Sequence, residues 1–157
     1  MAPARSSARF ASLTCVAFSL LLLAGCPGEP AQEGALAPPP SSGQRWRFAQ
    51  PAGVELVLAV ESVGPRKVSY SAQTTIPDET PLAPLKLSYA RLPGPTLPEG
   101  EDVELVAAGV RFACRRSERE GFVTYTARAG GREAFPGVLR VEREGKAVYA
   151  LTAIEAK

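Results

Sequence analysis

Five short segments in the last third of the chain are rich in β-branched and other apolar residues, several of them alternate apolar with polar side chains, and each spacer between them contains glycine. A period of two places every second side chain on one side of an extended strand, whereas a helix repeats its apolar residues every three or four positions. Glycine in a short spacer supplies the positive φ angles that tight hairpin turns require. The pattern predicts an antiparallel meander over residues 102–107, 110–116, 122–127, 138–142 and 147–154.

The preceding part of the chain adds strands of the same kind, predicted at residues 45–48, 54–61, 67–75 and 85–90. Residues 76–100 hold six prolines, which lack the N–H that an inner strand donates, so the strand at 85–90 is expected at an edge. A single helical turn is allowed at 117–120. An antiparallel meander of about eight or nine strands curls or folds over, and we therefore predict an all-β half-barrel, barrel or sandwich.

Residues 1–25 have the three parts of an export signal: a basic start with Arg5 and Arg9, an apolar stretch over residues 10–23 and a small-residue end. A membrane-spanning helix needs about 20 apolar residues. The stretch here is shorter and is interrupted by serine and threonine. We expect a cleaved signal peptide over 1–25, with Cys26 as the first residue of the mature protein.

The sequence Leu23-Ala24-Gly25-Cys26 resembles the lipobox of bacterial lipoproteins. The resemblance implies that the Cys26 thiol receives a diacylglyceryl group and that a peptidase cuts between Gly25 and Cys26. It also implies an exported protein held in the cell envelope by acyl chains such as palmitate, each worth about 0.8 kcal/mol per buried CH₂. In this family an aspartate after the cysteine marks inner-membrane retention. Residue 27 is proline, so the resemblance favours the outer membrane and leaves the side of that membrane open.

The segment that follows Cys26 is rich in proline and glycine and has no aromatic residue up to residue 43. Such a segment buries too little apolar surface to offset the entropy of ordering. The run Pro38-Pro39-Pro40 favours an extended polyproline conformation. We therefore predict a lipid-anchored tether over 26–43 and a single β domain over 44–157.

The charge of the predicted mature chain argues against a nucleic-acid partner. Because Arg5 and Arg9 lie in the signal, 16 basic residues remain against 16 acidic ones. A nucleic-acid-binding domain would carry a basic excess along one face. The sequence therefore predicts no nucleic-acid partner.

Histidine is absent, which removes the commonest general base and the commonest metal ligand. Cys114 alternates with Val110 and Phe112, so we expect a buried, structural thiol without a base to activate it. The carboxylates that remain as candidates for an acid/base pair or a calcium site are Asp78, Glu79, Glu99, Glu101 and Asp102. Neither group has the spacing of a calcium loop. We predict no catalytic residue, metal site or cofactor, with a carboxylate-dependent envelope enzyme as the alternative.

Three aromatic residues are the candidate ligand contacts: Trp46, Tyr70 and Tyr89. Trp46 is the only tryptophan, and its place in a first strand favours a core position, with a ligand platform as the alternative. The early tryptophan strand, the meander and the sequence 135–138, Phe-Pro-Gly-Val, are loosely similar to the curved sheets of envelope lipoproteins and lipoprotein carriers.

A sheet with an apolar face and few helices to cover it predicts a non-enzymatic binding module for a protein or an apolar ligand. The contact region would be the concave face together with the loop at 76–100. A purely structural role in the envelope remains the other possibility.

Overall fold

The computed structural model describes residues 35–156, which belong to one compact unit. The predicted signal peptide, the lipobox with Gly25 and Cys26, and the tether up to residue 34 lie outside the described residues. Within residues 35–156, no helix has the length and apolar character needed to cross a membrane.

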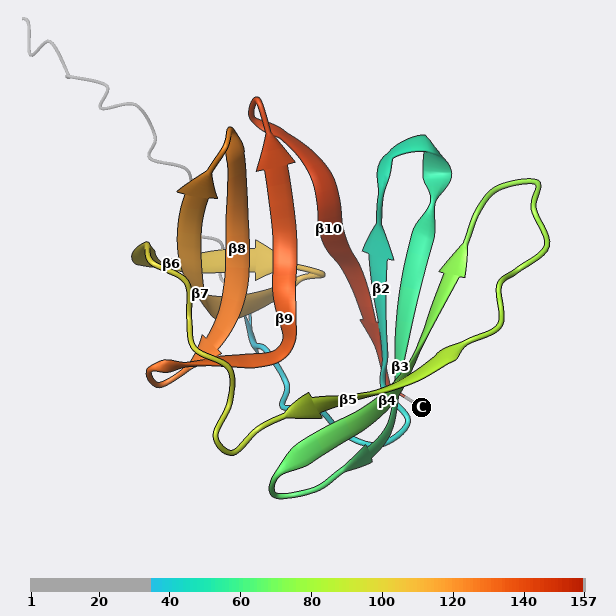
Figure 1. Cartoon of the computed structure of the whole chain (residues 1–157), viewed down its shortest axis with the longest axis horizontal. Helices are drawn as coiled ribbons and strands as arrows, with labels where there is room; N and C mark the ends of the chain where they lie inside the picture. Colours follow the sequence, from blue (N-terminus) through green and yellow to red (C-terminus); the bar gives the residue numbers. More distant parts are fainter. Residues whose placement is uncertain (1–34, 157) are drawn as a thin grey trace, which may run out of the picture. The chain divides into compact units, whose positions relative to one another are not determined.

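Ten strands in one curled sheet make up most of the described chain (Figure 1). The sheet is open, and its order is β1-β7-β8-β9-β10-β2-β3-β4-β5, with β6 paired to β7. This confirms the predicted all-β antiparallel meander in its half-barrel form. The strands are β1 (Ala35–Leu36), β2 (Arg45–Ala49), β3 (Glu55–Val63), β4 (Lys67–Thr75), β5 (Leu85–Ala90), β6 (Glu101–Ala107), β7 (Val110–Arg119), β8 (Phe122–Ala129), β9 (Arg132–Arg143) and β10 (Lys146–Glu155), and a single 3-10 turn covers Pro51–Gly53.

Alternation along these strands places one side chain in two on the concave face. In the ladder of β2, β3 and β4, Trp46 lies opposite Leu58, which lies opposite Ala72. Residues directly opposite one another share a face of the sheet. The buried apolar side chains on this face form the core: Trp46, Phe48, Leu58, Val60, Val68, Phe112, Cys114, Ala127, Phe135, Leu139 and Leu151.

The helical turn allowed at 117–120 is wrong, because β7 continues as a strand to Arg119. Ser117 and Arg119 pair with β8 instead. The hairpin turns at Glu120 and Gly121, whose φ angles of 54° and 79° are the positive pair of a type I′ turn. That turn matches the twist of paired strands, so the ladder extends to the turn itself.

Strand β9 begins at Arg132, six residues before the predicted start at 138. Thr126 of β8 pairs with Val138, but Arg128 pairs with Glu133, so β9 carries extra residues at this point. Pro136 cannot donate to a ladder, and Gly137 has a φ of 89°, a combination that favours a bulge. The strand bends here (Figure 1).

Residues 35–43, which the sequence assigns to the tether, lie against the sheet. Strand β1 runs parallel to the start of β7, and the Ala37 N–H donates to the Arg111 carbonyl at 2.9 Å. The Gly43 N–H donates to the Val60 carbonyl at 2.8 Å. The structure differs from the expectation here because backbone hydrogen bonds, which apolar composition does not reveal, hold the segment.

Candidate functional site

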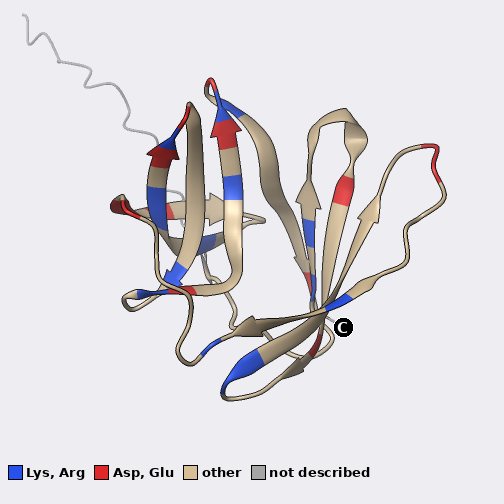
Figure 2. Ribbon diagram, viewed as in Figure 1, with Lys and Arg blue, Asp and Glu red and all other residues tan. Residues whose placement is uncertain are grey.

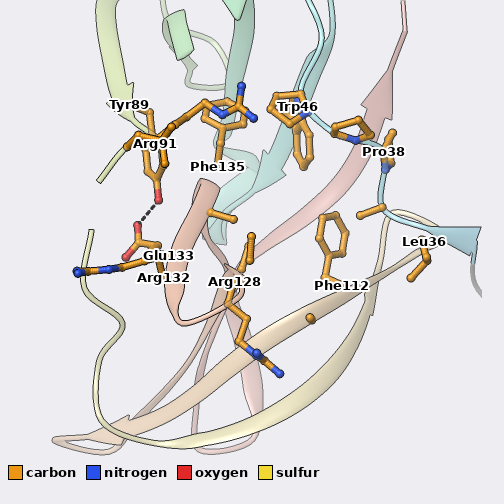
Figure 3. A pocket seen from close by; sticks show the side chains of 18 of the residues that line it. Leu36, Pro38, Trp46, Tyr89, Arg91, Phe112, Arg128, Arg132, Glu133 and Phe135 are labelled. Carbon is orange, nitrogen blue, oxygen red and sulfur yellow. Dashed lines mark hydrogen bonds between the residues drawn. The ribbon is translucent and has the colours of Figure 1, made fainter. Parts of the chain in front are cut away.

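A cavity of about 520 Å³ lies on the concave side of the sheet, beneath residues 36–40 (Figure 3). Its volume falls within the roughly 300–1,000 Å³ typical of small-molecule sites. Aromatic rings line it from four strands, proline side chains from the segment after β1, and arginines from four positions. The aromatic residues are Trp46, Tyr89, Phe112 and Phe135, and the arginines are Arg91, Arg111, Arg128 and Arg132.

Phe135 is the centre of the aromatic group. Its ring centroid lies 5.6 Å from that of Trp46, 5.7 Å from that of Tyr89 and 5.4 Å from that of Tyr70, all in edge-on arrangements. Phe112 completes the group, 6.1 Å from Trp46. Edge-to-face rings attract through their quadrupoles. The bulge in β9 therefore brings together rings from β2, β4, β5 and β9. The apolar wall of the cavity is formed by Trp46, Tyr89, Phe112 and Phe135.

Gln44, just before β2, connects the tryptophan to the proline segment. Its side-chain oxygen accepts a hydrogen bond from Trp46 Nε1 at 3.3 Å and another from the Ser41 backbone N–H at 3.0 Å. Gln44 is only 5% exposed, and its bond with Trp46 is buried, whereas its bond with the exposed Ser41 is partly buried. Gln44 thus links the orientation of the Trp46 indole to the position of the backbone at Ser41, which directly follows the proline segment.

Residues 36–40 form one side of the cavity, next to Trp46 and Phe112 (Figure 3). Leu36, Ala37 and Pro38–Pro40 all line the cavity. Leu36 is nevertheless 75% exposed, so this wall is thin and one edge of it faces solvent. In Figure 3, Pro38 lies beside Trp46.

Glu133 is the only carboxylate that lines the cavity within the described part of the chain. Its Oε1 accepts a hydrogen bond from the Tyr89 hydroxyl at 2.9 Å, shown as a dashed line in Figure 3. Burial, together with this carboxylate, raises the pKa of Tyr89 well above its usual value. Gly137 permits this arrangement, because a Cβ there would lie 2.8 Å from Glu133 Oε1. The pair is a neutral phenol bonded to a carboxylate at one end of the cavity.

The four arginines differ in how their charge is compensated. Arg128 Nη2 lies 3.3 Å from Asp102, and Arg111 Nη1 lies 3.8 Å from Glu104. Arg132 donates to the Thr96 hydroxyl, and Arg91 donates to the Gly64 carbonyl at 3.1 Å. Arg91 and Arg132 therefore have neutral partners only, within residues 35–156.

The candidate acids do not meet in this cavity. Asp102 lies between Arg115, at 2.9 Å, and Arg128, while Glu101 pairs with Arg116 at 3.2 Å. Figure 2 shows acidic and basic segments close together on β7 and β9. Asp78, Glu79 and Glu99 are exposed in loops. Within residues 35–156 no group of three or more Cys, Asp or Glu residues is placed to hold a metal ion.

Two of the three aromatic residues predicted as ligand contacts, Trp46 and Tyr89, line the cavity. Tyr70 is not in its lining but packs against Phe135 from behind. Trp46 is 1% exposed, so it is both a core residue and part of the cavity wall. Phe135 and Arg91 line the cavity but were not among the predicted ligand contacts. Arg91 follows Tyr89 by two positions, so the alternation of β5 was the available signal for it.

Cys114 is fully buried, as predicted from its alternation with Phe112. Burial raises the pKa of its thiol from 9.0 to about 12, although the charge of Arg128 acts in the opposite direction. The thiolate is the reactive form of cysteine. Cys114 is therefore held as an unreactive thiol within the core.

Comparison of this chain with family models, with curated proteins and with solved structures gave no match.

Proposed function

We propose that this protein is an exported lipoprotein, anchored in the cell envelope through Cys26, whose β domain binds an apolar small molecule. The observation that carries the binding proposal is the cavity of about 520 Å³ with its wall of aromatic rings. Sites for small molecules are concave and mostly apolar, with a few polar groups that orient the ligand. Here Glu133, Tyr89 and the arginines are those polar groups.

The anchoring proposal is supported by the lipobox-like sequence ending at Cys26. Leu36, the first residue in the cavity wall, lies ten positions after Cys26. A chain of that length spans at most roughly 35 Å. An acylated Cys26 would therefore hold the cavity close to the membrane surface, where apolar ligands are concentrated.

A protein partner is the second candidate. Leu85 and Leu87 on the edge strand β5 are exposed, as is Leu82 in the loop before it. An unpaired strand edge with apolar side chains is suited to strand addition by another chain. The cavity is the more specific feature, because it combines a concave apolar lining with polar groups at its margin.

The binding proposal is tested by titrating the full chain with the neutral apolar fluorophore N-phenylnaphthylamine. Because Trp46 is the only tryptophan and lines the cavity, energy transfer from it to the probe reports binding there. Ala134→Leu fills part of the cavity and should weaken binding by about tenfold or more, corresponding to roughly 1.4 kcal/mol. Ala90→Leu is the matched control, because Ala90 is exposed and lies outside the lining. An Ala134→Leu protein that binds the probe like the wild type would refute the proposal.

The anchor is tested by growing cells with a labelled fatty acid and comparing the wild type with Cys26→Ala. Label should be lost from Cys26→Ala and retained in Cys15→Ala. Equal labelling of the wild type and Cys26→Ala would exclude the anchor.

A further inference from the structure

We propose that the ligand of the cavity is an anionic amphiphile, with one apolar chain against the aromatic wall, and that Arg91 binds its anionic head group. This inference rests on the proposed function, because it assigns the chemistry of the molecule that occupies the same cavity.

The position of Arg91 is the first argument. Strand β5 places Leu87 and Tyr89 on the concave face, and the next residue in that alternation is Arg91. Its backbone N–H donates to the Arg66 carbonyl at 2.7 Å, which fixes the main chain at the cavity margin. Figure 3 shows its guanidinium extending from the Tyr89 side towards Trp46. Arg91 therefore lies where the polar end of a ligand in the cavity would be found.

The charge balance of the lining is the second argument. Four arginines and a single carboxylate, Glu133, line the cavity, and Glu133 already accepts a hydrogen bond from Tyr89. Arg111 and Arg128 both have acidic partners on β6. Within the described residues, the Arg91 guanidinium donates only to the Gly64 carbonyl. An anion at this position would compensate the remaining positive charge.

Arg132 is the other arginine with a neutral partner only, but it is placed differently. It donates to Thr96, and Figure 3 shows it directed away from the aromatic rings. Arg91 instead approaches the rings, and a guanidinium presents several N–H donors in the geometry that carboxylate and phosphate oxygens accept. The shared chemistry is thus an apolar chain ending in a carboxylate or a phosphate.

The test measures displacement of N-phenylnaphthylamine from the full chain by four amphiphiles of equal chain length, each below its micelle concentration. Dodecanoate and dodecyl phosphate carry the anion, dodecanol is neutral and dodecyltrimethylammonium is a cation. Wild type should bind at least one anion about tenfold or more tightly than dodecanol, the effect of one charged hydrogen bond. The anion that binds with the higher affinity, dodecanoate or dodecyl phosphate, shows whether the head group is a carboxylate or a phosphate.

Arg91→Gln should lower the ratio of anion affinity to dodecanol affinity to about one. Arg119→Gln is the matched control, since Arg119 is exposed at the end of β7 and lies outside the cavity. Equal affinity of wild type for dodecanol and both anions would overturn the inference while leaving the proposed function intact, as would an Arg91→Gln protein that keeps the preference. Failure of every amphiphile and of the probe to bind would overturn both.

Discussion

Phe135 on β9 and Leu87 on β5 both belong to the concave face of the sheet, yet Phe135 is 7% exposed and Leu87 is 44% exposed. Leu87 lies opposite Tyr70 in the ladder, and Tyr70 in turn packs against Phe135. The two side chains are therefore separated by a single tyrosine. Apolar alternation places both on the same face, but it does not decide which of them is covered.

Phe135 and Leu87 differ in exposure because different side chains cover them on the concave side of the sheet. The bulge in β9 carries Phe135 towards rings from three other strands, so they exclude water from one another. Strand β5 is an edge strand, paired with β4 alone in the ladders of the described chain. Burial on an open, curled sheet is thus set by its bends and not only by its pattern.

Replacing Phe135 by alanine tests this comparison most directly. Loss of the central ring should lower the free energy of unfolding by about 3–5 kcal/mol, the usual cost of removing a buried phenylalanine. Leu87→Ala, on the same face, should cost less than about 1 kcal/mol because the side chain is already exposed. Urea denaturation followed by Trp46 fluorescence measures both. Equal costs would show that the two regions are covered to the same extent.

The bend in β9 is tested next, by Gly137→Ala. The positive φ at this position and the contact of an added Cβ with Glu133 Oε1 should together cost about 1–3 kcal/mol. Gly131→Ala is the control, since nothing lies within 4 Å of a Cβ there. Thermal unfolding of the two variants compares them. A Gly137→Ala protein as stable as Gly131→Ala would mean that the bend does not depend on glycine.

Replacing Cys114 tests how completely water is excluded from the core around Phe135 and Phe112. Its expected effect on the free energy of unfolding is the smallest of the three. Cys114→Ala should cost about 1 kcal/mol below pH 9, since it removes one buried heavy atom. The folded thiol has a pKa near 12 against 9.0 ordinarily, so the unfolded chain releases its proton first. The stability advantage of the wild type should therefore be complete below pH 9 and decline from pH 9 towards pH 12.

Denaturant unfolding of both proteins across this pH range measures the decline. The titration of the tyrosines affects both proteins equally, so it cancels when their free energies of unfolding are subtracted. A constant difference between the wild type and Cys114→Ala would mean that water reaches the thiol in the folded state. A thiol reagent at pH 8 gives the independent reading, because Cys114 should react only after unfolding.

Most of the strands could be predicted from local pattern. The bounds predicted for 67–75 and 85–90 agree with β4 and β5, because alternation and flanking proline or glycine act within a few residues. The place of Phe135 at the centre of the aromatic group could not be predicted, since it depends on a register shift against β8 that the alternation of apolar residues does not encode. The pairing of β1 uses only backbone groups, so it leaves no trace in the side chains. Trp46 and Tyr89 could be predicted as candidate contacts because they are aromatic. That both line one cavity could not, because it depends on how the sheet curls.

Strand β1 gives the cavity a mechanical property. Residues 36–40 form one wall of the cavity. Only the two-residue ladder of β1 and the hydrogen bond of the Ala37 N–H join the start of this wall to β7. A tensile load applied to the chain upstream of residue 35 reaches those few bonds before it reaches β2. Tension would separate residues 35–37 from β7 and expose one side of the cavity, while the pairing of the other strands would remain intact.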